Sequence, residues 1–110
     1  MTDHDVIVIG GGPAGLAAAL AAHENGASVL IVEREERLGG MLKQCIHDGF
    51  GLRRFGERLA GPEYVERFMD KLAQTDIEVS CRTFVTHAMK TDDGFAVTLV
   101  SREGLRTVTG

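Results

Sequence analysis

A glycine-rich loop near the start of the chain constrains the fold more than any other feature. Residues 10–15 read GGGPAG and directly follow Val6–Ile9, an unbroken run of β-branched residues. Such a run is typical of a strand buried on both faces, as in a parallel sheet. Ala14–Asn25 is rich in alanine and leucine and favours a helix, and Pro13 suits its first turn. The order therefore predicts a strand, a tight turn and a helix.

The segment after this helix repeats the strand pattern and ends on an acidic residue. Gly26 is well placed to end the helix in a left-handed conformation. Val29–Val32 is a second short apolar run, and Glu33 follows it. These segments together predict a βαβ unit of about the usual length.

The spacing Gly10-x-Gly12-x-x-Gly15 in this setting predicts a dinucleotide-binding loop. Gly10 permits the tight turn, Gly12 lets the backbone approach a pyrophosphate, and Gly15 lets the helix pack close to the strand. The N-terminus of the helix offers N–H groups and partial positive charge to phosphates. Glu33 is placed to accept hydrogen bonds from ribose hydroxyls. Its charge would repel an extra 2′-phosphate, which disfavours NADP in this pocket.

The rest of the chain predicts one more helix and a set of short strands. Residues 34–61 hold many glycines and charges and show no clean period. A helix is expected from Pro62, with an apolar stripe that ends at Leu72 and Ala73. Turn signals separate the expected strands, which are Ile77–Cys81, Phe84–Met89, Phe95–Val100 and Leu105–Thr109.

Composition limits the classes of protein to which the chain can belong. Its 110 residues suffice for one small domain, and its formal net charge of −4 argues against a nucleic-acid surface. No apolar run is long enough to span a bilayer. The two cysteines form no CxxC pair, which favours reduced thiols and a cytoplasmic location. Cys45 and His47 have no second pair of ligands nearby, so no metal site is expected. His4 has no partner in the sequence and is expected at the surface.

Three sequence segments carry a resemblance to a known family. VIVIGGGPAGLAAA (residues 6–19) resembles the FAD-binding start of the pyridine nucleotide-disulfide oxidoreductase superfamily, and EREERLGG (33–40) resembles that superfamily's second region. GGMLKQCIHDGFG (39–51), with GPEY (61–64) after it, resembles a narrower group of bacterial FAD- and NAD(P)-dependent oxidoreductases that are often grouped with dye-linked dehydrogenase subunits. The resemblance covers nearly the whole chain.

The resemblance implies a fold and a set of cofactor-binding residues. The fold would be α/β, a Rossmann-like three-layer arrangement of a parallel sheet, helices and an antiparallel β-meander. The pyrophosphate loop would consist of Gly10, Gly12, Pro13, Ala14 and Gly15, with Glu33 and Arg34 on the adenosine side. Gly39, Gly40 and Met41 would pass near the flavin side, and the backbone of Val85 would contact the adenine. The resemblance indicates no catalytic acid or base.

The resemblance also implies a function and a domain organisation. Residues 1–110 would form the N-terminal portion of an FAD-binding domain, truncated before its last strand, and the second dinucleotide-binding domain would be absent. The parent enzyme would move a hydride or electrons between a small-molecule substrate, FAD and a nicotinamide or other acceptor. NAD(P) would bind elsewhere in the full-length enzyme. A second copy of the chain or a redox subunit would be its protein partner.

Two other functions and one departure from the family pattern stay open. The fingerprint alone also allows an NAD-binding domain of a dehydrogenase, or a non-catalytic fragment with a nucleotide-binding fold. Disulfide reductases of the superfamily carry two cysteines shortly after the paired glycines, whereas this chain has only Cys45 there. The family's strand order also leaves one edge of Val6–Ile9 without a partner, so we expect the isolated chain to self-associate or aggregate there and to hold FAD weakly.

Overall fold

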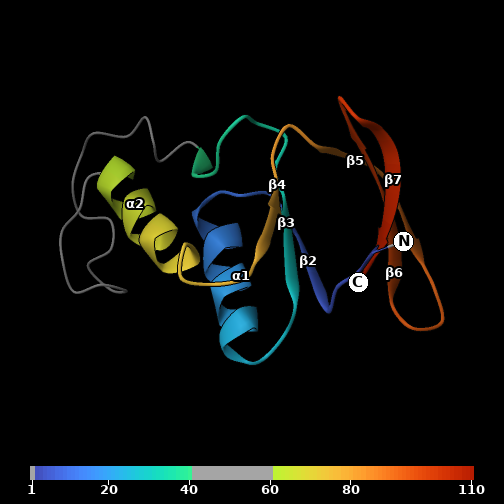
Figure 1. Ribbon diagram of the computed structural model, residues 1–110, viewed down its shortest axis with the longest axis horizontal. Coiled ribbons are helices and arrows are strands. Elements are labelled where there is room, and N and C mark those ends of the chain that lie inside the picture. Colours follow the sequence, from blue (N-terminus) through green and yellow to red (C-terminus); the bar gives the residue numbers. More distant parts are fainter. Residues whose placement is uncertain (1, 41–60) are drawn as a thin grey trace.

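The protein folds into three layers, which Figure 1 shows side by side: two helices, a parallel sheet and an antiparallel sheet. This computed structural model describes residues 2–40 and 61–110. The expected fold class, an α/β Rossmann-like arrangement with a parallel sheet and a β-meander, is confirmed. The elements in chain order are β1 (Thr2–Asp3), β2 (Val6–Ile9), α1 (Pro13–Glu24), β3 (Val29–Val32), α2 (Gly61–Leu72), β4 (Glu78–Ser80), β5 (Phe84–Lys90), β6 (Phe95–Ser101) and β7 (Gly104–Thr109).

The parallel sheet has the order β2-β3-β4, so β3 lies between its two partners. Val6 pairs with Val29, and Leu30 pairs with Glu78. In the described part of the chain this order leaves one edge of β2 without a partner, as the family's strand order implies. All four residues of β3 are buried, because helices cover one face of the sheet and the meander covers the other.

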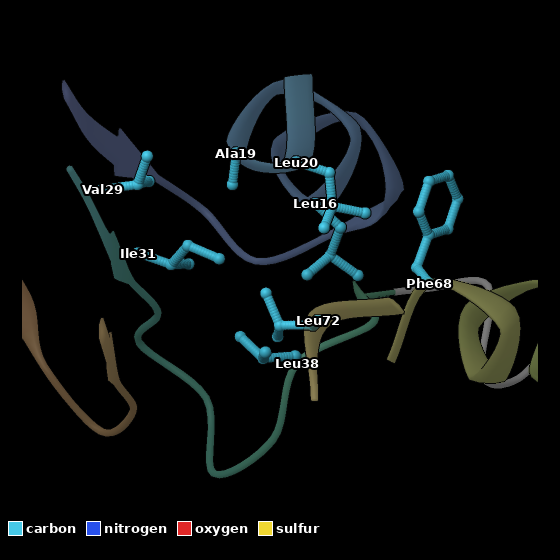
Figure 2. Packing of buried hydrophobic residues seen from close by; sticks show 8 residues of the cluster. All are labelled: Leu16, Ala19, Leu20, Val29, Ile31, Leu38, Phe68 and Leu72. Atoms are coloured by element: carbon cyan, nitrogen blue, oxygen red, sulfur yellow. The ribbon is translucent and has the colours of Figure 1, made fainter. Parts of the chain in front are cut away.

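Helix α1 begins and ends where its sequence predicts. Pro13 occupies its first turn, Asn25 is its C-cap, and Gly26 adopts a φ of +88°. Its buried face presents Leu16, Ala19 and Leu20 to the sheet. Figure 2 shows these side chains gathered with Ile31 of β3 and with residues of α2 in one apolar cluster, whose buried members are Leu16, Ala19, Leu20, Val29, Ile31, Leu38, Phe68 and Leu72.

The antiparallel sheet has the order β1-β7-β6-β5 and packs on the other face of the parallel sheet. A second buried cluster lies between the two sheets and consists of Leu30, Val32, Val97, Leu99 and Val108. β1 pairs parallel with β7. The sequence did not predict this two-residue strand, because so short a segment carries no periodicity. Neither helix in the described part of the chain is long and apolar enough to cross a membrane.

Three details of burial differ from the sequence-based expectation. Ile9 is 62% exposed, whereas its strand was expected to be buried on both faces. It ends β2, and strand alternation puts it on the same face as Ile7, toward the antiparallel sheet and not toward α1. His4 was expected at the surface without a partner, yet its side chain is only 7% exposed and its Nε2 lies 2.7 Å from a carboxylate oxygen of Glu78. Ala73 is exposed, because α2 ends one residue before it.

Candidate functional site

The glycine loop connects the carboxyl end of β2 to the amino end of α1. Gly10 adopts a φ of +106°, and its N–H donates to the carbonyl of Val32 over 2.8 Å. Gly12 is the N-cap of α1, and the first helical hydrogen bond runs from the N–H of Leu16 to its carbonyl over 2.9 Å. No side chain caps this end and no acidic residue lies in the first turn. The amide groups before Leu16 therefore present partial positive charge.

The three motif glycines differ in what a side chain would meet. A Cβ at Gly15 would collide with the carbonyl oxygen of Gly10 and would lie 3.3 Å from Cγ1 of Val8. The fold therefore requires glycine at this position. Gly12 has a φ of −77°, which any residue adopts, and among the described residues a Cβ there would meet no atom within 4 Å. Within this part of the chain, packing gives no reason for the missing side chain of Gly12.

Glu33 links the end of β3 to the glycine loop. Its side chain is buried, with only 7% of the residue exposed. Its Oε1 accepts the N–H of Gly11 over 2.7 Å, and its Oε2 accepts the N–H of Glu35 over 2.7 Å. A carboxylate has about four lone-pair sites, so two remain for a ligand. The sequence predicted a hydrogen-bond acceptor at this place. The structure adds that both carboxylate oxygens also accept hydrogen bonds from backbone N–H groups.

Gly39 and Gly40, which follow Glu33 in the sequence, lie beside the glycine loop. The N–H of Gly39 donates to the carbonyl of Gly11 over 2.7 Å. Gly40 approaches so closely that a Cβ there would lie 3.3 Å from the Cα of Gly12. Both have positive φ, +115° and +60°. Two segments that are more than twenty residues apart in sequence thus meet at one place.

A groove of about 340 Å³ lies at the carboxyl ends of β2 and β3, next to the loop. Two of its apolar residues are largely exposed, Ile9 at 62% and Phe84 at 53%. Its polar groups come from Glu33, Arg34 and Thr83. The complete lining is Ile9, Gly10, Val32, Glu33, Arg34, Thr83, Phe84 and Val85.

The structure brings together most of the residues that the sequence predicted for the site. Gly10, Glu33, Arg34 and Val85 line the groove. A Cβ on Gly40 would contact Gly12 and Pro13, and the N–H of Gly39 is hydrogen-bonded to the loop. Ala14 is exposed in the first turn of α1, and Gly15 packs beneath the loop on Gly10. Met41, Cys45 and His47 lie outside the described residues.

Sequence reasoning missed three contributors to this arrangement. Gly11 donates to Glu33, and a Cβ on it would collide with Leu38. The middle position of the GGG run was the available signal for this close approach. Thr83 and Phe84 line the groove, but no motif marks them in the sequence. Within residues 2–40 and 61–110, no group of three or more His, Cys, Asp or Glu side chains could hold a metal ion.

Known proteins resemble this chain in sequence and in structure. Residues 5–52 match the profile of the family described as FAD dependent oxidoreductase. A ferredoxin–NADP reductase from Streptococcus sanguinis is 33% identical over 100 residues, which cover 86% of this chain and 30% of the reductase. Two solved structures, each aligned over nearly all of this chain, share the fold.

An L-proline dehydrogenase from P. horikoshii superposes with a TM-score of 0.83 and 26% identity over 99% of this chain and 21% of the dehydrogenase. A thioredoxin reductase from T. acidophilum superposes with a TM-score of 0.77 and 25% identity over 98% of this chain and 34% of the reductase. The chain therefore spans about a third or less of the length of these relatives.

Proposed function

The chain belongs to the superfamily of FAD- and NAD(P)-dependent oxidoreductases, and from this membership we propose that its glycine loop and groove hold the ADP half of FAD. In this proposal residues 1–110 are the N-terminal part of an FAD-binding domain. The protein of which they form part transfers a hydride or electrons between a small-molecule substrate, FAD and a nicotinamide or other acceptor.

The observation that carries the proposal is the open space in front of α1. Gly12 lacks a side chain although its backbone and its described surroundings would accept one. An uncapped helix N-terminus faces the same space, and such an end binds anionic groups. A pyrophosphate there would receive backbone N–H groups and the positive end of the helix dipole. The residues present therefore fit the diphosphate of a dinucleotide.

The groove beside the loop fits the adenosine portion of the same cofactor. Glu33 keeps two lone-pair sites for ribose hydroxyls after it has accepted two backbone N–H groups. The exposed apolar surfaces of Ile9 and Phe84 match the face of a purine ring, which is the part of the nucleotide that gains most from leaving water. Arg34, Thr83 and the backbone of Val85 are further polar groups that line the groove.

The chain's own residues bind and orient the cofactor in this proposal, and the flavin supplies the redox chemistry when it is bound. Gly39 holds the segment after β3 against the glycine loop, since its N–H donates a hydrogen bond to the carbonyl of Gly11. The substrate, the electron acceptor and the binding of NAD(P) belong to the longer protein that the relatives' lengths suggest.

A titration of the 110-residue chain with FAD, ADP, FMN and NAD tests the proposal. We expect the chain to bind FAD and ADP, because both carry the diphosphate and adenosine that the loop and groove recognise. FMN should bind at least about tenfold more weakly, a difference of about 1.4 kcal/mol. Quenching of flavin fluorescence gives the dissociation constants for FAD and FMN, and displacement of FAD gives that for ADP. Tighter binding of NAD than of FAD would instead favour a dehydrogenase domain, and no binding would favour a non-catalytic fragment.

Replacing Glu33 by alanine should weaken both FAD binding and the fold. The change removes a charged acceptor from the ribose, a loss of about 1.5–3 kcal/mol, so FAD should bind one to two powers of ten more weakly. It also leaves the N–H groups of Gly11 and Glu35 without their acceptor. Unfolding should therefore cost about 1–3 kcal/mol less.

Glu33→Gln is the matched control, since its amide keeps one acceptor oxygen and nearly the same shape. It should fall between the wild type and Glu33→Ala in both measurements. The dissociation constant comes from flavin fluorescence and the free energy of unfolding from urea denaturation. An unchanged dissociation constant in Glu33→Ala would contradict a role for this carboxylate at the ribose.

A further inference from the structure

The connection between β4 and β5 holds a residue in an unfavourable backbone conformation. Arg82 has a φ of +50°, and among the described residues it is the only non-glycine with a positive φ. A side chain with a Cβ disfavours this left-handed conformation, which persists only where the surrounding structure imposes it. The conformation at Arg82 therefore calls for a structural reason.

The backbone hydrogen bonds of this turn supply that reason, because they reach the segment around Glu33. The N–H of Arg82 donates to the carbonyl of Glu35 over 2.9 Å, and the N–H of Thr83 donates to the carbonyl of Glu33 over 3.0 Å. At the end of β4, two residues before Arg82, the carbonyl of Ser80 accepts the N–H of Glu33 over 2.9 Å. The turn thus holds the backbone of Glu33 on both sides and the backbone of Glu35 as well.

The turn is braced from within. The hydroxyl of Thr83 donates to the carbonyl of Cys81 over 2.9 Å and lies 3.0 Å from the hydroxyl of Ser80. Thr83 itself is only 2% exposed. The turn is hydrogen-bonded both to the end of β4 and to Glu33. A change in the backbone conformation of the turn would therefore move Glu33.

The guanidinium of Arg82 contributes much less than its backbone. It lies 3.1 Å from a carboxylate oxygen of Glu36, but both side chains are more than half exposed. Solvent and salt screen such pairs, and most add little. The backbone conformation at position 82 is therefore the feature that matters for Glu33.

We propose that Arg82 is a positioning residue for the nucleotide site: its left-handed backbone aims the Glu33 carboxylate at the ribose and so sets the preference for a ribose with free hydroxyls. The carboxylate can meet a ligand only from the place where the turn, Gly11 and Glu35 hold it. This inference rests on the proposed function, since it needs a nucleotide in the groove. It assigns the specificity of that site to a residue outside every motif in the sequence.

The test compares how strongly variants of the chain discriminate between two probes, ADP and 2′,3′-dideoxy-ADP. The dideoxy probe lacks the ribose hydroxyls that would donate hydrogen bonds to Glu33, but it keeps the adenine and the diphosphate. We expect the wild type to bind ADP at least about tenfold more tightly, as for loss of a hydrogen bond to a charged group. The ratio of the two dissociation constants, measured by calorimetry, is the readout.

Four variants separate the backbone from the side chain. Arg82→Gly accepts a positive φ and should keep the wild-type ratio. Arg82→Val disfavours that φ most strongly, so its ratio should fall to about 3 or less. Arg82→Ala removes the guanidinium but keeps a Cβ, as arginine does, so it should keep the wild-type ratio. Glu36→Gln removes the partner of the ion pair and should behave as the wild type. Arg102→Val, at an exposed turn residue without a positive φ, controls for the exchange of arginine for valine.

Four results would overturn the inference. If Arg82→Val weakens both probes equally and leaves the ratio unchanged, the residue is merely structural. If Arg82→Gly lowers the ratio as much as Arg82→Val does, the side chain and not the backbone is responsible. Should Arg82→Val fail to fold in a thermal unfolding scan, an unchanged ratio in Arg82→Thr, which is also β-branched, overturns the inference equally. A wild-type chain that binds neither ADP nor FAD would overturn the proposed function, and this inference with it.

Discussion

Replacing Gly12 by valine is expected to abolish FAD binding while leaving the chain folded. The backbone at this position, with φ −77° and ψ −175°, is extended and suits a β-branched residue. A Cβ there meets no described atom within 4 Å, so the fold need not change. The added side chain would instead occupy the space in front of α1 and keep a pyrophosphate away from the N–H groups. We expect at least about a hundredfold loss of affinity, roughly 2.7 kcal/mol.

Flavin fluorescence measures this loss, and a thermal unfolding scan without cofactor measures the fold. Ala18→Val is the matched control, because Ala18 is exposed on the same helix and lies away from its N-terminus. It introduces the same residue and should leave the affinity for FAD unchanged. A Gly12→Val chain that retains FAD with wild-type affinity would show that the cofactor does not bind at this loop.

Replacing Gly15 by alanine should produce the opposite pattern, a loss of stability before any loss of binding. The new Cβ would collide with the carbonyl oxygen of Gly10, which is backbone and cannot swing aside. Overpacking of this kind costs about 1–3 kcal/mol and sometimes more. In an unobstructed helix the same change would add about 0.5–1 kcal/mol of stability. The sign of the effect therefore reports the close contact between α1 and the loop.

Gly12→Ala is the control for this experiment, because it makes the same chemical change three residues earlier, where the Cβ has open space. Urea denaturation of the two variants without cofactor should give a lower free energy of unfolding for Gly15→Ala and nearly the wild-type value for Gly12→Ala. Equal or greater stability in Gly15→Ala would mean that the helix lies farther from the loop than described.

The sequence by itself determined the βαβ unit and its glycine loop. The runs Val6–Ile9 and Val29–Val32, the helix between them and the meander strands all follow from local signals: apolar runs, helix propensity and turn residues. Each of these signals acts over a few residues, so it is visible without the fold. The same local pattern indicated Glu33 as an acceptor beside the loop, and the structure puts its carboxylate 2.7 Å from the N–H of Gly11.

Some expectations stay predictions although the fold agrees with them. The binding roles of the glycines, of Glu33 and of Val85 need a bound nucleotide, and self-association through β2 needs a measurement in solution. The strand order puts β3, and not β2, between two neighbours in the described part of the parallel sheet. One edge of β2 therefore has no partner strand in this part of the chain, and the expectation of self-association depends on that unpaired edge.

Only the tertiary structure decided what surrounds Glu33 and which distant segments meet. Thr83 and Phe84 reach the groove because β4 pairs with β3 and the chain then crosses to the second sheet. Arg82 adopts its positive φ because its own N–H donates to Glu35 and the N–H of Thr83 donates to Glu33, about fifty residues earlier. His4 meets Glu78, which lies 74 residues later in the sequence, only in the folded chain. Each of these facts depends on contacts between distant segments, whose register is set by burial and hydrogen bonding in the folded chain and not by any local pattern of residues.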